Sequence, residues 1–141
     1  MENTLNELFV NLFHQILGIE EKTIKKNFGR MTLNDMHVIE AIGPGEAKNM
    51  SSLAKALRVT MGSLTISVNA LVKKGYVNRV RSEKDRRVVL VSLTKEGKEA
   101  YKHHQEYHKQ MIRSIVQNLD ENEQEVLEKA LHKLSDFFIP S

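Results

Sequence analysis

Apolar residues recur at steps of three and four along most of the chain, which is the spacing of one face of an α-helix. The first such stripe runs from Leu5 to Ile24, so the pattern predicts one long N-terminal helix that ends near Gly29. Thr32 and Asp35 have the spacing of a capping box. They predict the start of a second helix, which a Gly-Pro-Gly sequence ends.

Two shorter helices are predicted next. Asn49 can cap a helix that ends near Arg58, and Thr60 can cap a longer helix that Gly75 ends. Two helices joined by such a short turn are typical of a helix-turn-helix, here at residues 49–75.

After this point the apolar spacing changes from helical steps to short runs rich in Val. The runs at 76–81 and 88–93 are separated by a polar, charged stretch, which predicts two strands joined by an exposed loop. A hairpin in this position, directly behind a helix-turn-helix, is expected to form a wing.

Two further helices are predicted to complete the chain. Thr94 can cap a fifth helix, and Asp120 with Glu123 has the spacing of a capping box for a sixth. The apolar stripes of the first, fifth and sixth helices are too extensive for a small winged domain to cover. We therefore expect them to pack on each other and on a second copy of the chain.

The predicted fold class is therefore mostly α with a small β-hairpin wing. It is a winged helix-turn-helix with long N- and C-terminal dimerisation helices. We interpret residues 1–141 as a single domain. Its parts are the dimerisation helices at 1–30 and 94–141 and the winged helix-turn-helix at 32–93, with the helix-turn-helix at 49–75 and the wing hairpin at 76–93.

Charge is segregated along the chain, although the formal net charge is only +3. Residues 55–113 hold fourteen Lys or Arg and five Asp or Glu, whereas the remainder holds seven and thirteen. A concentrated basic block on an otherwise acidic protein indicates a polyanionic partner, and double-stranded DNA fits the predicted fold.

The predicted fourth helix carries most of the recognition chemistry. Leu64, Val68, Leu71 and Val72 share one face and are expected to be buried. The opposite face has short and mostly uncharged side chains, which can approach base edges closely in a major groove. An ordinary solvated helix face would carry more long charged side chains.

The wing is expected to add a second contact surface. Arg86 and Arg87 at the loop tip can enter a minor groove, and Asp85 is expected to orient a neighbouring Arg by a charge-assisted hydrogen bond. The complete predicted DNA-binding set is Thr60, Gly62, Ser63, Thr65, Ile66, Asn69, Lys73, Asp85, Arg86 and Arg87.

Composition excludes several other classes of protein. The absence of cysteine rules out disulfides, thiol catalysis and Cys-based zinc sites. No Ser or Thr lies in a nucleophile-elbow or phosphate-loop pattern, so we predict no catalytic residue and no enzyme. No apolar run is long enough to span a membrane, and we expect a cytoplasmic protein. A protein-interaction module or a DNA-coating protein remains an alternative of a different class.

The sequence from Asp85 to Gly97 resembles the wing motif of the multiple-antibiotic-resistance regulator (MarR) family. In that motif an Asp and an Arg two apart precede a strand that ends Leu-Thr-x-x-Gly, and here these positions are Asp85, Arg87, Leu93, Thr94 and Gly97. The resemblance covers essentially the whole chain as a single MarR-type domain. It implies a homodimeric winged-helix regulator on a palindromic operator, usually a ligand-responsive repressor. Many members carry Arg near the position of Ile66, so the base preference here is expected to differ.

A closer resemblance points to one branch of this family. The segments Val59–Thr65, Lys74–Val77, Arg81–Glu83 and His108–Met111, together with Asn69, look like the fatty-acid-synthesis repressor branch of Gram-positive bacteria. This resemblance implies repression of fatty-acid synthesis genes, with acylated acyl carrier protein as co-repressor and the acyl chain inside the protein. The expected effector pocket comprises Leu12, Ile16, His37, Tyr101, His104, His108 and Met111.

The histidines leave a second effector open. His104 and His108 are one helical turn apart, and His37 with Glu20 or Glu21 can supply further ligands for a metal ion. This set resembles the zinc-sensing branch of the family. We assign no cofactor and no metal from the sequence, and keep zinc-responsive and small-phenolic-ligand-responsive repressors as alternatives to the acyl-responsive one.

Overall fold

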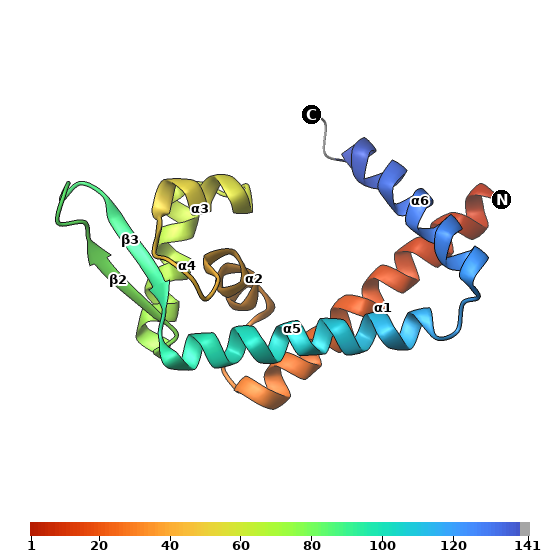
Figure 1. Cartoon of the computed structure of the whole chain (residues 1–141), viewed down its shortest axis with the longest axis horizontal. Coiled ribbons are helices and arrows are strands. Elements are labelled where there is room, and N and C mark those ends of the chain that lie inside the picture. Colours follow the sequence, from red (N-terminus) through yellow and green to blue (C-terminus); the bar gives the residue numbers. More distant parts are fainter. Residues whose placement is uncertain (139–141) are drawn as a thin grey trace. The chain divides into compact units, whose positions relative to one another are not determined.

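The computed structural model describes residues 1–138 and contains six α-helices and a three-stranded sheet within them (Figure 1). The helices are α1 (Glu2–Phe28), α2 (Leu33–Ile42), α3 (Met50–Leu57), α4 (Met61–Lys74), α5 (Lys95–Val116) and α6 (Glu121–Phe138), and the strands are β1 (Lys48–Asn49), β2 (Val77–Arg81) and β3 (Val89–Leu93). The predicted fold class is confirmed.

The chain divides into two compact units, Met1–His104 and Gln105–Ser141, and the boundary falls inside α5. The first unit holds α1, the helix-turn-helix, the sheet and the first turns of α5. The second unit holds the rest of α5 and α6.

The predicted caps start the helices where the sequence placed them. Asp35 N donates to Thr32 Oγ1 and Thr32 N donates to Asp35 Oδ2, both at 3.0 Å, so the capping box of α2 is complete. The Asn49 side chain caps α3, and the Thr60 hydroxyl oxygen caps α4 by accepting from Ser63 N at 3.1 Å. These bonds satisfy backbone donors that no helical carbonyl can reach.

The sheet has one strand more than the sequence predicted. Its order is β1-β3-β2, and both pairings are antiparallel. The predicted hairpin is present as β2 and β3, with Val77 opposite Leu93 and Arg81 opposite Val89. The additional strand β1 is only two residues long, too short to leave a readable alternation in the sequence.

The core lies in the winged helix-turn-helix and is closed by helices on either side of it in sequence. Buried residues of α2, α3, α4 and the sheet form one cluster with Ile24 of α1 and Ala100 of α5. On α4, the predicted inward residues Leu64, Val68 and Leu71 are buried. The prediction for Val72 was wrong, because this side chain is 37% exposed.

The motif Leu-Thr-x-x-Gly joins the end of the wing to the end of α4. Thr94 N donates to Tyr76 O at 3.0 Å, and the Thr94 hydroxyl donates to Gly75 O at 2.7 Å. Thr94 Oγ1 also accepts from Gly97 N, which caps α5. A Cβ atom at Gly97 would overlap the Tyr76 carbonyl oxygen, so this close approach requires glycine.

Extensive apolar surface is exposed in each unit. In the first unit, Leu8, Leu12 and Phe13 of α1 are each more than half exposed. In the second unit, α6 has no buried residue, and Leu131 is 53% exposed. Within residues 1–138, no helix is both long enough and apolar enough to cross a membrane.

Candidate nucleic-acid interface

The outward face of α4 is open to solvent along its length, as the sequence predicted. All seven of its proposed contact residues are exposed, namely Thr60, Gly62, Ser63, Thr65, Ile66, Asn69 and Lys73. Ile66 is the most prominent apolar group there, with 74% of its surface exposed. An exposed isoleucine surrounded by small polar residues is suited to contact a thymine methyl group.

The hydroxyl groups at the start of α4 are already oriented by local hydrogen bonds. Thr65 Oγ1 donates to Met61 O at 2.8 Å, and Thr60 Oγ1 donates to Ser63 Oγ at 3.1 Å. Because the Thr65 proton is used within the helix, this side chain presents its methyl group and oxygen lone pairs outward. It can therefore accept a hydrogen bond or pack on an apolar base edge.

Asn69 is held by the wing. Arg79, on β2, donates from its guanidinium group to Asn69 Oδ1. The Asn69 amide nitrogen keeps its two donors, because the partner atom of this bond is the amide oxygen. The recognition helix and the wing are thus connected through a residue of the predicted contact face.

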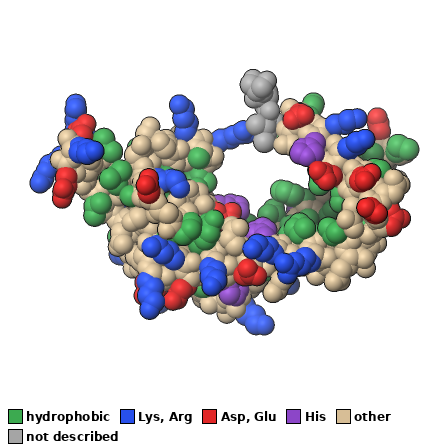
Figure 2. Space-filling view, in the orientation of Figure 1, with side chains coloured by type: hydrophobic (Ala, Val, Ile, Leu, Met, Phe, Trp, Pro, Cys, Tyr) green, Lys and Arg blue, Asp and Glu red, His purple; other side chains and the backbone are tan. Residues whose placement is uncertain are grey.

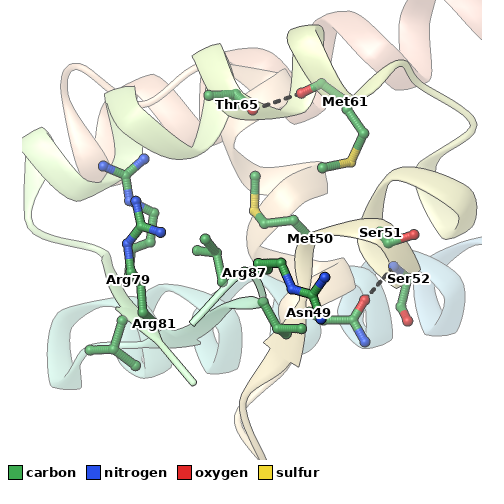
Figure 3. Close-up of a pocket in the computed structure, with 12 residues that line it drawn as sticks. Asn49, Met50, Ser51, Ser52, Met61, Thr65, Arg79, Arg81 and Arg87 are labelled. Atoms are coloured by element: carbon green, nitrogen blue, oxygen red, sulfur yellow. Dashed lines mark hydrogen bonds between the residues drawn. The ribbon is translucent and has the colours of Figure 1, made fainter. Parts of the chain in front are cut away.

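A cleft of about 760 Å³ lies between the helix-turn-helix and the wing (Figure 3). Its walls come from the start of α3, from Met61 and Thr65 of α4, and from the two wing strands. Arg79, Arg81 and Arg87 line it, so the cleft is basic. Guanidinium groups in such a cleft suit the phosphates of a DNA backbone.

Arg79 and Arg81 were missed as individual contact residues, although the sequence placed them in the basic block. The signal was available in their spacing. Residues two apart on a strand share one face of a sheet, and β2 therefore directs both arginines to the same side. Figure 2 displays Lys and Arg side chains around the wing with acidic side chains between them.

At the wing tip, the structure confirms that Asp85 orients an arginine. Arg87 Nε donates to Asp85 Oδ1 at 3.2 Å, and Arg87 N donates to the same oxygen at 3.1 Å. The backbone N–H of Arg87, and then its guanidinium group, lower the pKa of Asp85 below its ordinary value. The Arg87 side chain remains 92% exposed, so it is oriented and accessible together.

The C-terminal end of α4 is anchored to the N-terminal end of α2. Lys74 Nζ lies 2.6 Å from Asp35 Oδ2 and 3.1 Å from Arg30 O. Asp35 is buried, with 6% of its side chain exposed. This ion pair fixes the recognition helix against the capping box of α2.

The expected effector residues are placed very differently from one another. In the first unit, His104 is buried, Ile16 and Tyr101 are half-buried, and Leu12 and His37 are exposed. In the second unit, His108 and Met111 are half-buried. His104 contacts Glu20, which the sequence had paired with it, and also Glu40, which it had not.

A helix-turn-helix with an exposed recognition face and a basic β-hairpin defines a winged-helix DNA-binding regulator of the MarR type. The family profile described as transcriptional regulator SarA/Rot matches residues 21–104, and the chain belongs to this family. Its relatives are transcriptional regulators and not enzymes, which confirms the predicted lack of catalysis.

Individual relatives agree with this assignment. The chain is 30% identical to the HTH-type transcriptional regulator BilQ of Clostridium symbiosum, over 74% of this chain and 72% of the relative. It is 28% identical to the uncharacterised HTH-type regulator YpoP of Bacillus subtilis, over 75% and 70% of the two chains.

Solved structures match over nearly the whole length. Streptococcus pneumoniae FabT in complex with DNA superimposes with a TM-score of 0.93 at 37% identity, covering 98% of this chain and 97% of that one. The Staphylococcus aureus MepR–DNA complex has a TM-score of 0.76 at 20% identity, covering 92% and 94%, and supports the fold alone.

Proposed function

We propose that this protein is a repressor that binds a palindromic operator as a homodimer, with α4 reading base edges and the wing contacting the backbone and minor groove. The observation that carries the proposal is the exposed face of α4, which has short side chains and no charge before Lys73. A protein that merely coats DNA would favour Lys and Arg there. As such a regulator, the chain would act in the cytoplasm.

The dimer is supported by the exposed apolar residues of each unit. Leu8, Leu12 and Phe13 of α1, and Leu131 of α6, offer water more apolar surface than a monomer usually leaves contiguous. A twofold dimer would bring two copies of α4 to two half-sites about one DNA turn apart. Sedimentation showing a stable monomer that binds DNA singly at micromolar concentration would overturn this part of the proposal.

The division of labour between helix and wing is testable by mutation. Arg87→Ala should weaken binding to all duplexes and flatten its dependence on salt, because fewer counterions are released. Thr65→Ala should instead cost about 1–3 kcal/mol at the operator and little on random DNA. Fluorescence-anisotropy titrations at several salt concentrations separate the two. Equal losses of Thr65→Ala on operator and random DNA would mean that this face does not read bases.

We further propose that the regulated genes are those of fatty-acid synthesis, with acylated acyl carrier protein as co-repressor. The support is the branch resemblance of the sequence together with its similarity to FabT, a member of that branch. An acidic carrier protein would find a docking surface in the basic block of residues 73–87 or 95–109. The co-repressor can raise operator affinity only by its preference for the DNA-binding conformation.

Gel-shift titrations with carrier protein bearing acyl chains of different lengths test the effector. The expected result is tighter operator binding with long acyl chains than with the unacylated carrier. A phenolic carboxylate and a divalent metal serve as controls for the other effectors that the sequence left open. If the acylated carrier changes nothing while a control changes operator affinity tenfold, the acyl-responsive proposal is wrong.

A further inference from the structure

Three ionisable side chains from three helices meet inside the first unit, away from the DNA-binding face. Glu20 comes from α1, Glu40 from α2 and His104 from the early turns of α5. His104 Nε2 lies 3.0 Å from Glu20 Oε1 and 2.6 Å from Glu40 Oε1. The side chains of His104 and Glu20 are only 2% and 7% exposed, and that of Glu40 is 31% exposed.

The two carboxylates converge on the same ring nitrogen. An imidazole nitrogen carries at most one proton, so it can direct one well-aligned hydrogen bond and not two. The oxygen and nitrogen atoms of all three groups lie within 4.8 Å of one another. Such convergence on one point is the arrangement that ligands adopt around a shared cation.

The distances fit a small divalent ion. Nitrogen and oxygen ligands lie about 2.0–2.2 Å from such an ion, so neighbouring ligands in octahedral or tetrahedral geometry are about 3.0–3.5 Å apart. The His104–Glu20 distance of 3.0 Å already falls in this range. The His104–Glu40 distance of 2.6 Å needs to open by only a few tenths of an ångström, and Glu40 is the most exposed of the three.

Charge points the same way. Two carboxylates and a neutral imidazole carry two negative charges, which burial penalises unless they are compensated. A divalent cation cancels both charges, whereas a proton on His104 cancels one. One imidazole nitrogen with two carboxylate oxygens, and no sulfur, suits first-row ions such as Zn²⁺ and Mn²⁺ better than Mg²⁺ or Ca²⁺.

We propose that Glu20, Glu40 and His104 form a binding site for one first-row divalent metal ion. The ion would join α1, α2 and the start of α5 at one point, and α2 also carries the capping box to which Lys74 anchors the recognition helix. The site does not depend on the proposed function, because none of its residues belongs to the DNA-binding set.

Full-length protein freed of metal by a chelator and then dialysed should be titrated with Zn²⁺ and with Mn²⁺ by calorimetry. The expected result is one ion per chain with micromolar or tighter affinity for Zn²⁺ and weaker affinity for Mn²⁺, following the usual order of these ions. The bound Mn²⁺ should be visible by electron paramagnetic resonance. Mg²⁺ and Ca²⁺ should not displace either ion.

Substitutions of similar shape identify the ligands. Glu20→Gln and Glu40→Gln should each weaken Zn²⁺ binding at least about tenfold, and thermal unfolding should lose its upward shift with Zn²⁺. His103→Gln is the matched control, because His103 is the exposed neighbour of His104 on α5 and should bind as wild type. If His104→Gln does not fold, Glu40→Gln decides, since its side chain reaches solvent.

Two results would overturn the site. One is a wild-type protein that binds neither Zn²⁺ nor Mn²⁺ more tightly than about 100 µM, a weak affinity for three converging ligands. The other is unchanged Zn²⁺ affinity in both glutamine variants. In either case the cluster is a buried ion pair held by a proton. Loss of operator binding in the Thr65 test above would leave this result untouched, so the two proposals fail separately.

Discussion

Lys74→Met should destabilise the fold far more than an ordinary surface lysine would. Lys74 Nζ lies 2.6 Å from Asp35 Oδ2, and the substitution keeps the length of the side chain while removing its charge. The Asp35 carboxylate then stays buried with the backbone N–H of Thr32 as a remaining donor at 3.0 Å. Breaking a fully buried pair from one side costs about 3–5 kcal/mol.

The cost here should be smaller, because Lys74 is 28% exposed and part of its charge is solvated in the folded state. Exposed pairs contribute about 0–1 kcal/mol, so an intermediate value of about 2–3 kcal/mol is expected. Urea unfolding with an unchanged m-value measures it. Lys73→Met is the matched control, since Lys73 is exposed in the same last turn of α4.

A double-mutant cycle isolates the pair. Asp35→Asn combined with Lys74→Met should cost less than the sum of the two single variants, by about 1–2 kcal/mol. If Lys74→Met costs no more than Lys73→Met, the ion pair does not hold α4 against α2, and the anchoring described above is wrong.

Three further outcomes are expected. Gly97→Ala should cost at least about 1–3 kcal/mol in urea unfolding, because its methyl group would overlap the Tyr76 carbonyl oxygen; an unchanged midpoint would contradict that contact. In an NMR titration, the lowered pKa of Asp85 should return only part of the way to its ordinary value in Arg87→Ala, because the backbone N–H of residue 87, the larger cause, remains. Because that pKa is lowered, the carboxylate stabilises the wing above its ordinary pKa, and this support is lost as the pH falls through the lowered value. Thr60→Ala should destabilise the protein by about 1 kcal/mol through loss of the α4 cap, and Thr60→Ser should restore most of it.

Local signals in the sequence were enough for the boundaries of most elements. Caps such as Thr32 and Thr60 act within three residues of their own position, so the sequence carries the whole interaction. The wing motif was equally local, because Asp85 and Arg87 meet within the loop that contains them. The exposed face of α4 followed from helical periodicity alone.

Interactions between distant segments could not be derived in the same way. Arg79 meets Asn69 only because the wing folds back beside α4, and no periodicity encodes that partner. Val72 lies on the side of α4 that the heptad-like spacing marks as buried, but no neighbouring element covers it fully. Glu40 follows buried Met36 by four residues, so its face was readable, whereas its contact with His104 was not.

Thr94 has a consequence for how the protein can transmit a signal. A single residue separates β3 from α5, and that residue is bonded both to the first turn of α5 and to the carbonyl that closes α4. The junction therefore has no slack in which a rotation of α5 could be absorbed. An effector that turns the start of α5 must carry the wing and the end of α4 with it as one lever.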